Sequence, residues 1–161
     1  MIHILIDKQE KLPYTFDKSH FRESRADLET GDYIVYDYPK GIVIERKSLD
    51  DFVKSIQEDR FFKEIDRLKE FENPAIIVEG SLCQIKNHKY NNPIFPTRVI
   101  DLSTDILIQH KIPIVFCEDR QHAIYFTQNM IIKYVKTKTC TKVQEAPKKK
   151  RVIKQCPDDI I

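Results

Sequence analysis

The residues best suited to chemistry lie in one short stretch, GDYIVYDYPKGIVIERKSLDDF, from Gly31 to Phe52. Within it, Asp32, Glu45 and Lys47 stand beside strongly apolar segments, where a charge is costly unless it pairs, reaches water or binds something. Two carboxylates hold a hard divalent cation such as Mg²⁺ through oxygen ligands. A neighbouring ammonium stabilises the charge that develops on a phosphoryl group under attack. These residue types therefore point to metal-dependent hydrolysis of a phosphodiester.

The positions of these side chains depend on a predicted β-hairpin whose strands meet at a YPKG turn, residues 38–41. A loop of even length places Lys47 opposite Asp32. Because side chains alternate between the two faces of a strand, Asp32, Glu45 and Lys47 then share one face and Arg46 points to the other. A β-bulge would break this parity.

A simpler interpretation of the hairpin is a cross-strand salt bridge between Asp32 and Lys47, which needs no ligand. On spacing alone, this interpretation is preferred to a metal site. Asp51 also has a purely structural explanation, because SLDD at 48–51 has the Ser-x-x-acid pattern of a capping box before an apolar helix.

The surrounding pattern predicts strands that alternate with helices, which indicates an α/β fold around a mixed sheet. A short helix is expected at 18–25, and a kink or two helices within 48–71, because the polar QEDR segment divides two apolar sets. The other expected elements are strands at 2–7, 26–38 with a turn at Gly31, 41–47, 74–80 and 112–119, and helices at 97–111 and 120–136.

Composition describes an ordinary globular chain of 161 residues, 41% hydrophobic and 32% charged, with a net charge of only +2. Its apolar runs are too short to cross a bilayer, and it opens without a secretion signal, so we expect an intracellular protein. Four cysteines and five histidines are scattered without zinc-site spacing, which favours free thiols. With three glycines and no Gly-rich loop, the chain is not expected to bind a nucleotide cofactor.

The last segment differs from the rest, since helical periodicity fades after Lys136. We therefore predict one domain at 1–136 and a basic, flexible tail at 137–161. Its PKKKRV sequence is similar to a nuclear localisation signal, so a cytoplasmic or nuclear location is expected. A solvated tail is the favoured interpretation, with nuclear import or added phosphate contacts as alternatives.

The charged stretch resembles the GDx(n)ERKx(3)D signature of the XPF-type (ERCC4) structure-specific nuclease family. GDY at 31–33 and ERKSLDD at 45–51 match it, with Asp51 at the final aspartate. LIDKQE at 5–10 resembles the family's first strand, with Gln9 in place of the usual arginine. The helix that follows the signature also resembles the family, with Glu64 where glutamine is common.

The resemblance implies a restriction-endonuclease-like α/β core, with a mixed sheet flanked by helices. It implies Mg²⁺ or Mn²⁺ as cofactor, held by Asp32 and Glu45 with the Arg46 carbonyl as a third ligand, while Lys47 aligns the attacking water. Supporting roles are implied for Asp7 and Glu10 in completing the acidic cluster, and for Asp51 in holding Arg46 or Lys47 while it caps its helix. Arg46 would brace the site or touch a DNA phosphate, and Arg60 and Arg67 would bind DNA.

The implied function is a metal-dependent DNA endonuclease that cuts branched or flapped DNA in repair, recombination or replication. Because every acidic and lysine position of the signature is present, an active enzyme is favoured over a non-catalytic DNA-binding or scaffolding subunit of a heterodimer. A different endonuclease of the same fold, such as a sequence-specific one, is a third alternative.

Partners beyond DNA are also suggested by the last two predicted helices. Their many apolar positions favour a homodimer or heterodimer, with burial against the chain's own sheet as the alternative. Most family members carry helix-hairpin-helix modules with Gly-rich hairpins, and this chain has no glycine after Gly80. We therefore expect a stand-alone nuclease domain, or one that relies on another subunit to grip DNA.

Overall fold

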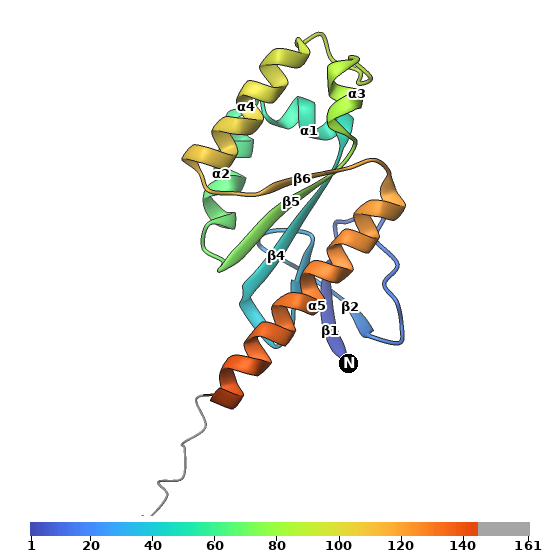
Figure 1. Ribbon diagram of the computed structural model, residues 1–161, viewed down its shortest axis with the longest axis vertical. Helices are drawn as coiled ribbons and strands as arrows, with labels where there is room; N and C mark the ends of the chain where they lie inside the picture. Colours follow the sequence, from blue (N-terminus) through green and yellow to red (C-terminus); the bar gives the residue numbers. More distant parts are fainter. Residues whose placement is uncertain (145–161) are drawn as a thin grey trace, which may run out of the picture.

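The computed structural model describes the backbone of residues 1–144 and the side chains through Thr141. A six-stranded mixed sheet lies between two layers of helices (Figure 1). The strands lie in the order β2-β1-β3-β4-β5-β6. They are β1 (Ile2–Asp7), β2 (Phe21–Ala26), β3 (Tyr33–Val35), β4 (Tyr38–Ser48), β5 (Asn73–Glu79) and β6 (Ile114–Cys117). The helices are α1 (Leu49–Ser55), α2 (Asp59–Leu68), α3 (Leu82–Lys86), α4 (Pro96–Gln109) and α5 (Arg120–Gln144). The predicted α/β class is confirmed.

Both faces of the sheet are covered, which explains why its central strands read as continuous apolar runs. Helices α1 to α4 cover one face, and α5 crosses the other (Figure 1). Along β4, Val43 belongs to the core under the first group of helices, whereas Ile42 and Ile44 belong to the core under α5. Strand β4 therefore carries side chains into both layers at the centre of the molecule.

The predicted hairpin forms, but its register is shifted. Tyr33 pairs with Ile44 and Ile34 with Val43, and an irregularity follows between Ile34 and Val35. The YPKG segment lies at the start of β4 and not in a turn, because the chain reverses at residues 36–37. The prediction that Lys47 faces Asp32 is therefore wrong, since continuing the register places Glu45 beside Asp32. The shift is of even length, so Asp32, Glu45 and Lys47 still share one face.

The helix predicted at 18–25 is also wrong. Phe21–Ala26 forms β2, an edge strand parallel to β1, in which Ile2 pairs with Phe21. Of its side chains only Phe21 is buried, so its sequence lacks the apolar alternation that marks a strand. Hydrogen bonds to β1 decide the conformation, and the charged residues suit an exposed edge. The first part of the strand predicted at 26–38 is likewise a loop that ends at Gly31.

The later elements follow the predictions closely. The kinked segment 48–71 consists of two helices, α1 and α2, and the predicted strands and helices from residue 74 onward are present. Helix α3 was not predicted, and α5 continues to Gln144, beyond the end expected at Lys136. The rest of the predicted tail, including PKKKRV, lies outside the described residues, so its roles and the domain limits stay predictions.

Two further expectations concern the described part of the chain. Cys83, Cys117 and Cys140 are free thiols. No helix within residues 1–144 combines the length and the apolar character that a membrane span requires.

Gly31 joins the loop to β3 in a conformation that side chains rarely adopt, with φ at 75°. A Cβ atom there would lie 2.2 Å from Val43 Cγ2 and 3.3 Å from the Ile44 carbonyl oxygen. We expect Gly31→Ala to lower the free energy of unfolding by about 2–4 kcal/mol, because both the backbone and a buried β4 residue are strained. Urea denaturation measures this change, with Glu29→Ala in the same loop as the exposed control. Equal stability of the two variants would contradict the packing described.

Candidate active site

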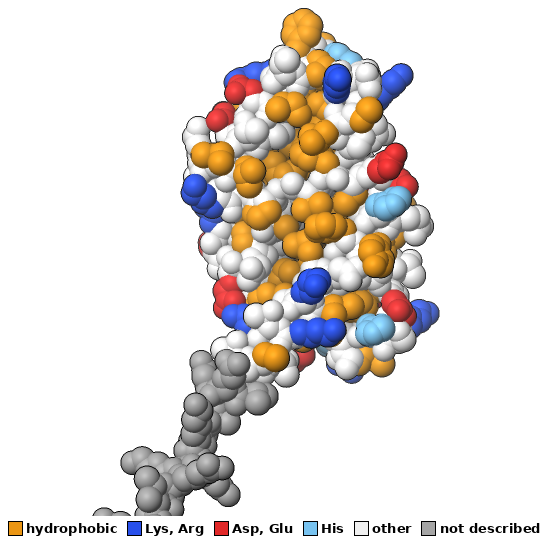
Figure 2. Space-filling model, viewed as in Figure 1, with side chains coloured by type: hydrophobic (Ala, Val, Ile, Leu, Met, Phe, Trp, Pro, Cys, Tyr) orange, Lys and Arg blue, Asp and Glu red, His pale blue; other side chains and the backbone are white. Residues whose placement is uncertain are grey.

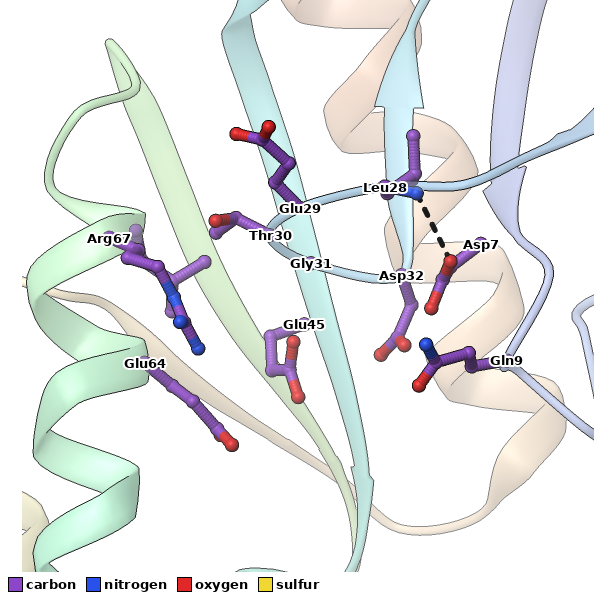
Figure 3. A pocket seen from close by; sticks show the side chains of 11 residues that line it. Asp7, Gln9, Leu28, Glu29, Thr30, Gly31, Asp32, Glu45, Glu64 and Arg67 are labelled. Atoms are coloured by element: carbon purple, nitrogen blue, oxygen red, sulfur yellow. Dashed lines mark hydrogen bonds between the residues drawn. The ribbon is translucent and has the colours of Figure 1, made fainter.

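Asp32, directly before β3, and Glu45 of β4 lie side by side in an open, polar pocket (Figure 3). Figure 3 shows Gln9 on the side of Asp32, with Glu64 and Arg67 approaching from α2 on the other side. The pocket is lined by Asp7, Gln9, Leu28, Glu29, Thr30, Gly31, Asp32, Glu45, Glu64, Arg67 and Leu68. The structure therefore brings together the two carboxylates that the sequence singled out.

Backbone hydrogen bonds fix Asp32 from both neighbouring strands. Its amide donates to the Ile44 carbonyl at 2.8 Å, and its carbonyl accepts from the Asp7 amide at 2.9 Å. The Arg46 amide donates to Asp32 Oδ2 at 2.7 Å. The carboxylate is thus held where the pairing of β3 with β4 ends. Because the N–H and C=O of a strand residue point to the same neighbour, the Arg46 carbonyl faces this side as well.

Lys47 contacts Glu45 and not Asp32, so the predicted Asp32–Lys47 salt bridge is wrong. Lys47 Nζ lies 3.1 Å from Glu45 Oε1 and 3.7 Å from Glu64 Oε2. It also lies 5.2 Å from the centre of the Phe61 ring. The side chains of Lys47 and Glu45 are only 12% and 17% exposed. Lys47 is therefore a nearly buried cation between two carboxylates.

The two central carboxylates hold their protons more tightly than ordinary ones. Burial and the charge of Glu45 raise the pKa of Asp32 to about 8, although the Arg46 amide opposes the shift. Burial also raises the pKa of Glu45, against the charge of Lys47. Burial opposes the charged form of Lys47, but Glu45 and Glu64 raise its pKa, so Lys47 stays protonated. Ionising both carboxylates would therefore leave negative charge without a full counterion, and a divalent cation fits this donor set.

The other predicted members of the acidic cluster make different contacts, and the charge of Glu10 adds to the raised pKa values of both Asp32 and Glu45. Asp7 lines the pocket, where its Oδ1 accepts from the Leu28 amide at 3.2 Å. Glu10 lies 3.5 Å from Arg46 NH1 and accepts from the Leu12 amide. Among the described residues, no group of three or more His, Cys, Asp or Glu residues is placed to hold a metal. Asp32 and Glu45 are therefore the candidate ligand pair.

Arg46 points away from the pocket, as its place between Glu45 and Lys47 predicts. Its guanidinium donates to both carboxylate oxygens of Glu79, at 2.7 and 3.0 Å. Hydrogen bonds to Glu79 raise the pKa of Arg46, against the effect of burial. This position favours the bracing role over contact with DNA. Glu79 was not singled out in the sequence, although an acidic residue that ends the apolar strand PAIIVE is a signal for such a partner.

Asp51 supports the start of α1. Ser48 is the helix N-cap and accepts from the Asp51 amide at 3.1 Å, as the capping pattern predicts. The Asp51 carboxylate accepts from the Ser48 hydroxyl at 2.8 Å. The guanidinium of Arg46 and the ammonium of Lys47, its expected partners, instead contact other carboxylates. The structure thus supports the helix-capping role.

The two arginines of α2 lie at different depths. Arg67 lines the pocket. The side chain of Arg60 is 83% exposed and its Nε lies 3.6 Å from Glu64 Oε1, so it reaches the site only through Glu64. Glu64 itself has a larger part than the sequence suggested, because it faces Lys47, Arg60 and the pocket.

The raised pKa of Asp32 predicts a site that destabilises the metal-free fold as the pH rises. The native state keeps the Asp32 proton up to about pH 8, whereas the unfolded chain releases it near the ordinary value of 3.8. Between these values the native state binds more protons, so stability falls with increasing pH. An asparagine side chain at this position would keep an acceptor for the Arg46 amide without the charge. In EDTA at a pH above about 8, Asp32→Asn should raise the free energy of unfolding by about 1–3 kcal/mol. Near pH 3.8 the substitution should change it little.

Urea denaturation across this pH range measures the effect. Asp66→Asn, which neutralises an exposed carboxylate on α2, is the control and should show no comparable gain. A gain for Asp32→Asn that is independent of pH would refute this account of the Asp32 charge.

Comparison with known proteins identifies the family of this chain. The model of the ERCC4 domain family matches residues 6–130. The chain is 32% identical to the 3′-flap repair endonuclease Xpf of Saccharolobus solfataricus, over 53% of this chain and 37% of that protein. It is 26% identical to a protein of Methanocaldococcus jannaschii named as a candidate ATP-dependent RNA helicase, over 98% of this chain and 20% of that one. The chain thus spans a minor part of the length of these curated relatives.

Solved structures show the same architecture. XPF from Aeropyrum pernix matches with a TM-score of 0.65 at 21% identity, over 89% of this chain and 69% of that one. Its complex with DNA matches with a TM-score of 0.61 at 20% identity, over 88% and 66% of the two chains. These likenesses show a restriction-endonuclease-like fold. Since the family model covers most of its length, the chain belongs to the ERCC4 domain family.

Proposed function

We propose that this chain is a Mg²⁺- or Mn²⁺-dependent DNA endonuclease that acts on branched or flapped DNA. The observation that carries the proposal is the pair of carboxyl groups of Asp32 and Glu45. Their pKa values are raised, and they lie beside a protonated Lys47 in an open pocket. The S. solfataricus relative is named for repair of 3′ flaps, and an A. pernix XPF was solved with DNA. The first name supports a flapped DNA substrate, and the second supports DNA binding.

Asp32 and Glu45 would hold the metal, with the Arg46 carbonyl as a third oxygen. The bound ion supplies Lewis acidity that polarises a phosphoryl oxygen and lowers the pKa of a water molecule. Asp32 has an oxygen available for this role, because the Arg46 amide occupies only one of its two.

Lys47 acts as a cation and donor and not as a base, because Glu45 and Glu64 keep it protonated. An ammonium has three donors, so donors remain after the contact with Glu45 to orient the attacking water or to offset charge on the phosphate. Arg67, at the wall of the pocket, is placed to bind a DNA phosphate, and the exposed Arg60 to bind one farther out. Chemistry and DNA binding thus fall to different side chains.

Nicking of labelled DNA tests the proposal directly. Wild-type protein should cut flap and fork substrates in the presence of Mn²⁺ or Mg²⁺. It should not cut them in EDTA. Asp32→Asn, Glu45→Gln and Lys47→Ala should each lower the rate by about 100-fold or more, since each removes charge from the reacting centre. Glu70→Gln, which changes an exposed carboxylate paired with Lys40, is the matched control and should cut at the wild-type rate.

Other outcomes identify the competing functions. DNA binding without metal-dependent nicking would mean a scaffolding subunit. Cutting of unbranched duplex at a fixed sequence would mean a different endonuclease of this fold. Equal cutting by wild type and Asp32→Asn would show that cleavage does not take place at the Asp32–Glu45 pair.

We also propose that two copies of this chain associate through the face that carries β6. A groove on this face is lined by Leu82 of α3, four residues of α4, and Ile114 and Phe116 of β6. Figure 2 shows apolar side chains along the middle of the face, with most charged ones near its margins. A face with few central charges meets its own copy without like-charge repulsion, and β6 is an edge strand that leaves one side of the sheet open. These features favour a second copy as the occupant.

Leu107 of α4 lines this groove and is 46% exposed. We expect Leu107→Glu to convert a dimer into a monomer of 19.1 kDa, because a buried, unpaired carboxylate is costly. Sedimentation of full-length protein at micromolar concentrations measures the mass. Tyr36→Glu changes an exposed residue near the β3–β4 reversal and should remain dimeric. A monomeric wild type would exclude the proposed contact.

A further inference from the structure

On the face of β4 opposite the pocket lies a second cluster of charged side chains, which the proposed chemistry does not use. Arg46 and Glu79 form a fork of two hydrogen bonds, at 2.7 and 3.0 Å. Their side chains are only 14% and 13% exposed. Paired, fork-like contacts of this kind fix geometry as well as charge. The cluster lies on the face covered by α5, opposite the pocket.

Arg120, the first residue of α5, ties this fork to the loop that follows β1. Arg120 NH1 donates to Glu79 Oε1 at 3.0 Å. Its NH2 donates to the carbonyl oxygens of Leu12 and Pro13, at 2.6 and 3.0 Å. Its guanidinium carbon lies 5.0 Å from the centre of the Tyr14 ring. Glu79 therefore connects two arginines from distant parts of the chain.

Two series of contacts connect this cluster to Asp32. In the first, Arg46 presents its guanidinium to Glu79 while its backbone amide binds Asp32 Oδ2 at 2.7 Å. In the second, Tyr14 stacks on Tyr33 with ring centres 5.1 Å apart, and the Tyr14 amide donates to the Tyr33 hydroxyl at 2.9 Å. Tyr33 is the residue next to Asp32.

We infer that Glu79 is a positioning residue of this site: it holds Arg46 from behind β4, and through the Arg46 backbone it fixes the amide that orients Asp32. The inference rests on the proposed function, since it concerns the same site. Groups that orient a metal ligand from outside affect metal affinity and rate by about 10–100-fold when changed. Glu79 touches no reacting atom and acts only through Arg46.

Glu79→Gln tests this role, because glutamine keeps the shape and removes the charge that grips Arg46. With DNA and Mn²⁺, we expect the kcat for nicking to fall by about 10–100-fold, with DNA affinity in EDTA unchanged. The affinity for Mn²⁺, measured by electron paramagnetic resonance without DNA, should weaken. Amide hydrogen exchange of Arg46 in the metal-free protein should become faster. Glu72→Gln, which breaks an ion pair with Lys138 elsewhere, is the matched control and should change none of these.

Breaking a buried pair leaves an uncompensated charge, so Glu79→Gln also lowers stability. Measurements are therefore made at a temperature where the variant is folded by circular dichroism. Arg120→Gln gives a milder second variant, because the Arg120 side chain is 34% exposed and the fork with Arg46 remains. It should show the same pattern with a loss of about tenfold or less.

The results separate this inference from the proposed function. Folded Glu79→Gln protein with unchanged Mn²⁺ affinity and Arg46 exchange would overturn the positioning role and leave a purely structural ion pair. A wild-type protein that cuts no DNA would overturn the nuclease proposal, while the binding and exchange measurements would still report on Glu79.

Discussion

Two carboxylates held side by side and partly out of water are the constraint around which this fold is organised. Asp32 and Glu45 repel each other, and burial raises the cost of ionising them. Only a rigid frame keeps such a pair in place. Here the frame is the pairing of β3 with both β1 and β4, together with the amide of Arg46 that binds the Asp32 carboxylate. The stability of the sheet thus maintains an arrangement that the charges alone would disperse.

Strand β4 makes this arrangement possible because it has a helix layer on each face. Three consecutive residues of β4 alternate between the two faces of the sheet. Glu45 and Lys47 face the pocket, and Arg46 between them faces the α5 side. The alternation of a strand therefore places reactive groups and their support back to back, one residue apart. This explains in physical terms why the ERK triplet is uninterrupted, since one inserted residue would exchange the two faces.

The sequence predicted the centre of the site more reliably than its surroundings. Glu45 and Lys47 share a face with Asp32 because the real register differs from the expected one by an even number of residues. The turn was misplaced because Pro39 suggests a reversal, whereas proline is also tolerated near the start of a strand. Strand β2 was missed because FRESRA has one buried side chain, so its conformation depends on β1. The contact of Arg46 with Glu79 depends on the register of β4 with β5, which local patterns do not encode.

Arg120 begins α5, the last helix of the described residues, yet it contacts the loop directly after the first strand. During translation the chain emerges from its amino terminus, so β1 to β5 leave the ribosome well before this arginine does. Every residue that lines the pocket is therefore synthesised before Arg120, whose contacts lie on the opposite face of the sheet. A nascent chain can therefore carry the whole signature before Arg120 of α5 contacts Glu79 and the loop after β1.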